Sequence, residues 1–418
     1  MSRAFGGVLR ERRYRNLWTG QTISMFGSQI TIIALPLAAT LTLHASAWQM
    51  GLLRAASTLP ALVFGLFVGG WIDRQRRRPV LIGADLARAL LLGSIPIAAI
   101  IGLLTIWQLL LVAFLAGICT LLFDVADMSL LPFLVRREEL VEGNSKLEVS
   151  RSGAMIIGPG VAGLLIQILT APIVIIFDAV SYVGSAWFIR QIVVNEATSA
   201  ATQRSSLWRD AREGLTIIAR QPILRTLAVS LACYNGFASL LNAVYVLFVI
   251  DIVHVTPAQY GLISALGSVG FFIGASLAAR VARWFGVGGA IVWGAVVSDM
   301  AFLLIPLADR PLAVAIPLLI AAQFGATLAG PITSINQLSL RQAIVESDVL
   351  GRVNGTMRFI SASMTPLGAI VGGVLGEHFG VAPTILLGAI GIQIGFVILL
   401  VSPLRRLSQL PPSRNASV

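Results

Sequence analysis

The sequence predicts an all-α membrane protein in which twelve transmembrane helices form two pseudo-symmetric six-helix bundles. Three observations lead to this prediction: the composition, the recurrence of long apolar segments, and the placement of the positive charges. Of the 418 residues, 56% are hydrophobic and only 12% are charged, and the mean hydropathy is +0.87. A soluble domain carries about 25% charged residues, so this chain has more apolar surface than one soluble core can bury.

The apolar segments are long enough to cross a bilayer, which takes about 20 residues in helical form. They lie near residues 17–43, 49–72, 80–104, 107–135, 153–170, 172–194, 223–250, 258–280, 286–307, 311–338, 359–377 and 381–402. Twelve spans of this kind, each a helix because lipid cannot satisfy an open backbone, account for most of the chain.

The positive charges fix the orientation of these spans. The turn between the second and third segments, residues 73–78, holds four arginines, and short loops rich in Lys and Arg stay on the cytosolic side. Alternating the loops from this turn places every lysine and arginine on the cytosolic side except Arg54, Arg88 and Arg310. We therefore expect both termini in the cytosol.

The longest polar interruption divides the spans six and six. The predicted parts are an N-terminal bundle, a cytosolic linker, a C-terminal bundle and a disordered cytosolic tail, at residues 1–194, 195–222, 223–402 and 403–418. The second part of the linker has an apolar stripe at helical spacing, which predicts a helix lying on the membrane surface. The stripe consists of Leu207, Trp208, Ala211, Leu215 and Ile218.

The two halves resemble each other at an offset of 210 residues. Gln49 and Gly51 then correspond to Gln259 and Gly261, and several further polar residues and glycines near span ends also coincide. Such a repeat is expected when two six-helix halves arise by duplication.

One loop carries a family resemblance. It reads Gly69-x-x-x-Asp73-Arg74-x-x-Arg77-Arg78. This pattern resembles the signature loop of the major facilitator superfamily (MFS), from which it departs at Arg76, where the family has a glycine. Further stretches resemble the bacterial branch that includes macrolide and siderophore exporters: Phe123-Asp124-Val125-Ala126, Leu131-Pro132, residues 142–148, Gly158-Pro159-Gly160 and residues 350–354.

The resemblance implies a secondary-active transporter of the bacterial inner membrane that exports drug-like or amphipathic molecules in exchange for protons by alternating access. It also implies that Asp73 of the loop gates the cytosolic face. Gly158, Pro159 and Gly163 resemble the antiporter motif of superfamily exporters, with Ala162 in place of one glycine. A pure packing role for these small residues is the alternative.

Ionisable residues inside spans are the strongest site candidates, because each needs a partner or a water-filled cavity. Asp85 and Arg88 lie three residues apart and can form an ion pair on one helix face. Asp124 and Asp127 share a face of the fourth span, where two carboxylates in one poorly solvated cavity favour proton uptake by one of them. The alternative is a structural role, in which the two acids form hydrogen bonds to neighbouring helices or pair with Arg88.

Two other acids, Asp178 and Asp299, are further proton-coupling candidates. The substrate cavity is predicted from a few polar side chains in otherwise apolar spans. These are Tyr234, Asn235, Asn242, Tyr245, Gln323 and Asn336. Helix-to-helix hydrogen bonding is the alternative for each of them.

Other functional classes find little support. The three histidines fall in separate outer loops and no catalytic or metal-binding motif occurs, so we expect no enzyme activity, no cofactor and no metal site. The excess positive charge lies between apolar spans and does not predict nucleic-acid binding. The expected partners are the lipid bilayer, a small-molecule substrate and protons, with the chain a monomer. A siderophore or metabolite exporter, a proton-symport importer and a nontransporting receptor on the same fold remain alternatives.

Overall fold

The computed structural model describes residues 7–72, 74–193 and 207–407. Asp73 of the signature loop, the first part of the linker and the last residues of the tail lie outside this range. The described residues form helices and connecting turns, with no β-strand among them. The all-α prediction is therefore confirmed.

The described residues form twelve longer helices, which follow one another in sequence. In the first half they are α1 (Arg12–Leu37), α2 (Ala47–Ile72), α3 (Arg77–Ile100), α4 (Ile106–Leu130), α5 (Leu140–Ile168) and α6 (Ala171–Arg190). In the second half they are α7 (Leu207–Arg220), α8 (Pro222–Leu247), α9 (Pro257–Phe302), α10 (Leu312–Ile344), α11 (Ser347–Phe379) and α12 (Val381–Val401).

Ten helical segments of the described residues are long and apolar enough to cross a membrane. One of them contains α9. This element covers two predicted spans, whose helices follow one another directly across a kink at Gly286. The backbone of Gly286 has a φ of 75°, a value that glycine adopts without steric cost. With α2, which covers the second predicted span, every predicted span corresponds to a helix in the structure.

The chain divides into two compact units. Unit 1 contains Met1–Ala45, Ala56–Arg204 and Thr256–Leu262, and unit 2 contains Ser46–Ala55, Ser205–Val255 and Ile263–Val418. The start of α2 thus belongs to unit 2, and the start of α9 belongs to unit 1.

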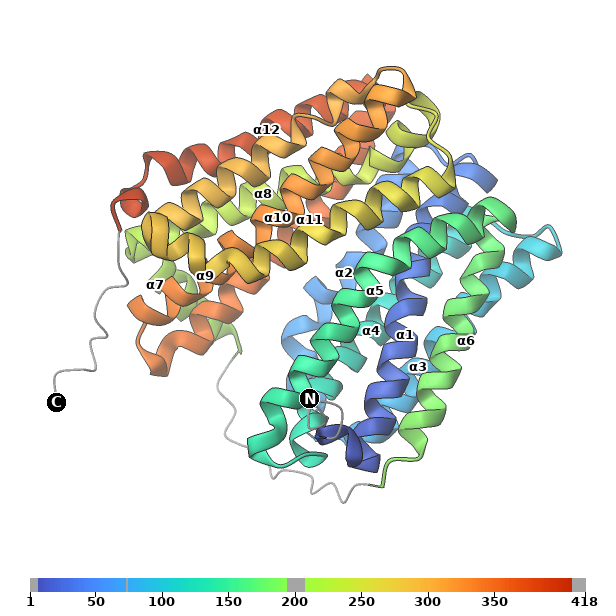
Figure 1. The fold of residues 1–418 in the computed structure, drawn as a ribbon, viewed down its shortest axis with the longest axis horizontal. Coiled ribbons are helices and arrows are strands. Elements are labelled where there is room, and N and C mark those ends of the chain that lie inside the picture. Colours follow the sequence, from blue (N-terminus) through green and yellow to red (C-terminus); the bar gives the residue numbers. More distant parts are fainter. Residues whose placement is uncertain (1–6, 73, 194–206, 408–418) are drawn as a thin grey trace. The chain divides into compact units, whose positions relative to one another are not determined.

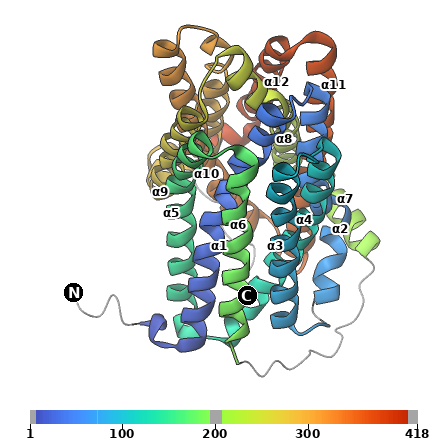
Figure 2. The ribbon, with the colours of Figure 1, turned by 90° about the vertical axis from the view of Figure 1, so that its right-hand side faces the viewer.

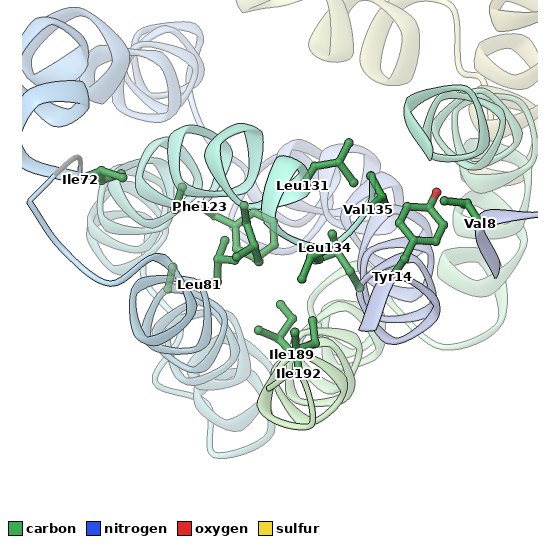
Figure 3. Close-up of a cluster of buried hydrophobic side chains, with 14 of the residues drawn as sticks. Val8, Tyr14, Ile72, Leu81, Phe123, Leu131, Leu134, Val135, Ile189 and Ile192 are labelled. Atoms are coloured by element: carbon green, nitrogen blue, oxygen red, sulfur yellow. The ribbon is translucent and has the colours of Figure 1, made fainter. Parts of the chain in front are cut away.

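In unit 1, α1 packs against α5 and α6, and α3 packs against α4 and α6 (Figure 2). An apolar cluster fills one end of this bundle, where α1 begins and where α4 and α6 end (Figure 3). Tyr14 lies in this cluster, fully buried, and its hydroxyl donates to the Gly143 carbonyl at 2.7 Å. The cluster fixes the helix ends of the bundle and so the height at which the polar side chains above it face one another.

In unit 2, α8 packs against α11 and α12 (Figure 1). The linker helix α7 also belongs to this unit and lies against α11 and α8. Its buried face carries Gly214 and Ile218, whereas Leu215 of the predicted apolar stripe is exposed. Glu213 of α7 forms an ion pair with Arg352 of α11 at 2.8 Å. The docking of α7 on α11 was not predicted from the sequence.

Candidate functional site

Three charged side chains in the described part of unit 1 are at most 5% exposed. Asp85, Arg88 and Asp178 are 0%, 5% and 1% exposed. Asp85 and Arg88 sit one turn apart on α3 and form the ion pair that their spacing predicts. Charges this far from water are stable only when they are paired and hydrogen-bonded, so the neighbours of each group decide what it can do.

Arg88 is held between two aromatic rings. Its guanidinium carbon lies 4.5 Å from the ring centroid of Phe123 on α4 and 4.1 Å from that of Tyr182 on α6. A guanidinium stacked on aromatic faces gains cation–π energy where water is absent. Arg88 therefore links α3 to both neighbouring helices through contacts that need no counter-charge on either one.

Asp178 on α6 has hydroxyl partners. Thr31 of α1 donates to the Asp178 carboxylate at 2.5 Å, and Ser181, which lies on α6 like Asp178, donates to it at 3.2 Å. One turn further along α6, the Tyr182 hydroxyl and Ser28 of α1 lie 2.8 Å apart, within hydrogen-bond distance. These bonds join α1 and α6 through neutral groups and leave Asp178 without an ion pair among the described residues.

The acids of α4 lie on the open side of this network. Asp127 is half-buried and accepts a hydrogen bond from the Gln21 amide of α1. Asp124 is exposed on the surface of unit 1 and interacts electrostatically with Arg88 and with Arg151 of α5. The two acids also interact with each other. The structure thus brings Asp124, Asp127 and Arg88 into one site, while Asp85 holds the direct ion pair with Arg88.

Several members of this site were not predicted from the sequence. Arg151 was assigned only as a marker of the cytosolic side, although it interacts electrostatically with the α4 acids. On α1 the polar residues recur at helical spacing and form a stripe that a search for period 3.6 could have found. The stripe consists of Gln21, Ser24, Ser28 and Thr31. Three of these four side chains bond to residues of α4 or α6.

Two arginines of the signature loop contact residues at or just beyond the ends of other helices. Arg77 is 7% exposed, and its guanidinium carbon lies 4.9 Å from the ring centroid of Phe133. Arg78 donates to the carbonyls of Ile189 and Arg190, where a cation also complements the dipole at the C-terminus of α6. Arg74 is exposed and Gly69 has open space around its α-carbon. The gating role of Asp73 concerns a residue outside the described range.

The antiporter-like motif of α5 packs tightly on two sides. A Cβ atom on Gly158 would lie 2.4 Å from Cβ of Gln29 on α1, and one on Gly163 would lie 2.9 Å from Cα of Gly261 at the start of α9. Both distances are too short for any larger residue. Pro159 contributes its carbonyl oxygen, which would lie 2.4 Å from a Cβ atom on Gly261.

Unit 2 contains a contact that corresponds to this one at the offset of 210 residues. There Gly51, at the start of α2, lies against Gly373 of α11, and a Cβ atom on Gly51 would lie 2.6 Å from Cα of Gly373. The duplicated halves therefore place glycine against glycine at equivalent positions, which allows two helix backbones to approach closely.

The predicted substrate-cavity residues of unit 2 bond mostly within their own helices. The amides of Asn235 and Asn242 donate to the carbonyls of Leu231 and Ala238, one turn back. Asn336 of α10 donates to its own helix and, at 3.4 Å, to the Ala278 carbonyl of α9. The remaining three residues pack against neighbouring elements or are buried. Tyr234 meets the Phe302 ring edge-on, Gln323 lies against Gly267, and Tyr245 is buried.

Comparison with known proteins decides the family. A sequence family described as transmembrane secretion effector, within the MFS, matches residues 5–416. The chain belongs to this family. It is similar to macrolide efflux protein A of Streptococcus pyogenes, with 23% identity over 94% of this chain and 97% of the relative. It is also similar to the multidrug efflux pump Tap of Mycolicibacterium fortuitum, with 28% identity over 86% and 88% of the two chains.

Solved MFS transporters share the fold. The nucleoside transporter NupG superposes with a TM-score of 0.74 at 12% identity, over 93% of this chain and 99% of NupG. A bacterial homologue of the iron transporter ferroportin, in an inward-facing state, gives 0.73 at 17% identity, over 93% and 98%. The predicted MFS fold and the prediction of a membrane transporter rather than an enzyme are therefore confirmed.

Proposed function

We propose that this MFS transporter exports amphipathic small molecules across the bacterial cytoplasmic membrane in exchange for protons, by alternating access, with both termini in the cytosol. The observation that carries the proposal is the group of α4 acids beside Arg88. It combines two carboxylates that interact with each other, a buried cation held by aromatic rings, and a second cation at the surface. Export is suggested by the relatives, whose names describe macrolide and multidrug efflux.

Asp124 is the group through which protons enter this site in our proposal. It is exposed on unit 1, six residues before α4 ends at Leu130, in an apolar span. An ionised carboxylate facing lipid is costly, on the order of 2.5–3.5 kcal/mol at the centre of a span. The face of the bundle that carries Asp124 is therefore expected to border water. A carboxylate at such a boundary can exchange its proton with solvent.

Asp127 stores the proton one turn away. When both acids are ionised they repel each other, and Arg88 and Arg151 offset that repulsion. When one acid takes up a proton the repulsion ends and the attraction for the two arginines weakens. Because these arginines stand on α3 and α5, the protonation state alters the forces between α4 and two neighbouring helices. This change is the proposed link between proton binding and helix movement.

The substrate is expected to be bulky and mainly apolar with few polar groups. The polar side chains of α8 and α10 that were predicted to line a cavity are sparse and partly occupied by local hydrogen bonds. Such a surface suits binding through apolar area and shape, with orientation set by a few polar contacts. Macrolides, tetracyclines, cationic dyes and siderophores are therefore the compounds to test.

The test is substrate-dependent proton movement in inside-out membrane vesicles. If the proposal holds, at least one compound releases protons from an acidified lumen, and Asp127→Asn or Asp124→Asn abolishes that release while the protein still inserts. Asp309→Asn is the matched control, because Asp309 is exposed outside the helices. Transport whose proton coupling survives both substitutions would exclude the α4 acids. Proton and substrate movement in the same direction would favour the importer alternative.

A further inference from the structure

Unit 2 contains a buried acid that plays no part in the site of unit 1. Asp299 of α9 is 2% exposed. Among the described residues no ion pair includes it. An ionised carboxylate withdrawn from water and without a cation is strongly unfavourable. Something other than a basic side chain of the described protein must therefore neutralise Asp299.

The groups around the carboxylate are neutral. The backbone amide of Phe396 on α12 lies close to it. A Cβ atom on Gly395 would lie 3.5 Å from Oδ2 of Asp299, so the glycine leaves space for the carboxylate. On α8, the Ser230 hydroxyl lies on the same side of Gly395 and donates to the Gly395 carbonyl at 2.9 Å. Tyr234 is the titratable residue of α8 that faces Asp299, and a phenol is neutral at physiological pH.

A nearby amide lacks a hydrogen-bond donor. Gln393 of α12 donates through Nε2 to the carbonyls of Asp299 and Ala389, both at 2.8 Å. Its Oε1 atom is buried and accepts no hydrogen bond from the described residues. Buried acceptors of this kind are rare and call for an explanation. One explanation is a proton donor beside Asp299 that the described residues do not supply. The same proton would also account for the uncompensated charge of the Asp299 carboxylate.

A proton fits this place better than a metal ion. A metal ion needs several convergent oxygen ligands, as hard cations show, whereas the neighbour of this carboxylate on α12 is the backbone amide of Phe396. No group of three or more acidic, histidine or cysteine side chains suited to a metal occurs among the described residues. A proton needs only the carboxylate itself and converts it into a neutral donor.

We propose that Asp299, enclosed by α8, α9 and α12, is a second proton-binding site of this transporter. The site lies in unit 2 and shares no residue with the α4 acids of unit 1. It therefore goes beyond the proposed function and does not depend on it: the coupling role of Asp127 can fail while Asp299 still binds a proton, and the reverse also holds.

Infrared difference spectroscopy of the purified full-length protein in lipid tests this directly. Protonated carboxyl groups have a C=O stretch that carboxylates lack. At neutral pH, Asp299→Asn should remove one such band, and Asp309→Asn, the exposed control, should remove none. Identical protonated-carboxyl bands in the native protein and in Asp299→Asn, at every pH measured, would overturn the proposal.

A second measurement needs no variant and covers the case in which Asp299→Asn does not fold. A hydrophobic carbodiimide adds to protonated carboxyl groups in apolar surroundings, and peptide mass spectrometry locates the adduct. We expect an adduct on Asp299 whose yield falls as the pH rises and is unchanged when sodium chloride replaces choline chloride. No adduct at any pH, or an adduct that sodium suppresses, would overturn the proposal, the latter in favour of a sodium site.

Discussion

Removing the buried cation of unit 1 should expose how much its ion pair contributes to stability. Arg88→Met deletes a guanidinium that is 5% exposed and leaves Asp85, which is 0% exposed, without its partner. Breaking a buried pair from one side costs about 3–5 kcal/mol. The loss of two aromatic contacts, at 4.5 and 4.1 Å, adds roughly 0.5–2 kcal/mol each. We expect Arg88→Met to destabilise the protein by at least ~3 kcal/mol.

The double variant Asp85→Asn/Arg88→Met isolates the reason. Replacing both members of a buried pair by neutral groups is often nearly neutral, so the double variant should recover most of the loss and unfold within about 2 kcal/mol of the native protein. Arg151→Met is the control, because Arg151 is 61% exposed and exposed ion pairs contribute less than about 1 kcal/mol.

The assay is denaturant unfolding of the purified protein in detergent micelles, followed by tryptophan fluorescence and helical circular dichroism. Two results would refute the reasoning. One is an Arg88→Met variant no less stable than Arg151→Met, and the other is a double variant less stable than Arg88→Met alone. Either would mean that the charge on Asp85 is not what makes the loss of Arg88 costly.

Three further predictions concern particular contacts. Gly261→Ala should destabilise the protein by about 1–3 kcal/mol through overpacking, since its Cβ atom would lie 2.4 Å from a carbonyl oxygen. The same substitution should slow efflux. Gly330→Ala is the control and should leave the efflux rate unchanged, because Gly330 has open space around it. Gln21→Leu removes the donor to Asp127 and should shift the pH dependence of transport without abolishing it; an unchanged pH profile would refute this. Gly214→Val should release α7 from α11, because a Cβ atom there would lie 2.2 Å from a hydroxyl oxygen, and limited proteolysis should then cut α7 faster.

The sequence was sufficient to predict the helices, because crossing a bilayer depends on local hydropathy and length. The spacing of Asp85 and Arg88 likewise predicted an ion pair that the structure contains. The partners of Arg88 were beyond prediction, since Phe123 and Tyr182 reach it from helices whose rotation about their axes depends on packing throughout the bundle. For the same reason Arg151 was assigned a topological role only.

The linker shows another limit of the sequence. The apolar stripe of α7 indicated an amphipathic helix, but hydropathy alone does not distinguish a lipid surface from a protein surface. Gly214 is the residue that could have indicated a protein surface, because an isolated glycine inside a helical pattern often has a packing reason. In the structure it faces Thr356 of α11, with the Glu213–Arg352 ion pair beside it.

The most direct test of proton-coupled export is gradient-driven transport by the purified protein in proteoliposomes. A fluorescent substrate found in the vesicle screen is added outside liposomes with an acidic lumen, and its accumulation is compared with that in liposomes without a pH gradient. The account predicts accumulation in the population of molecules whose cytosolic face is outward, only when the gradient is present, and none for the double variant Asp124→Asn/Asp127→Asn. Accumulation that ignores the gradient, or that persists in the double variant at the native rate, would contradict it.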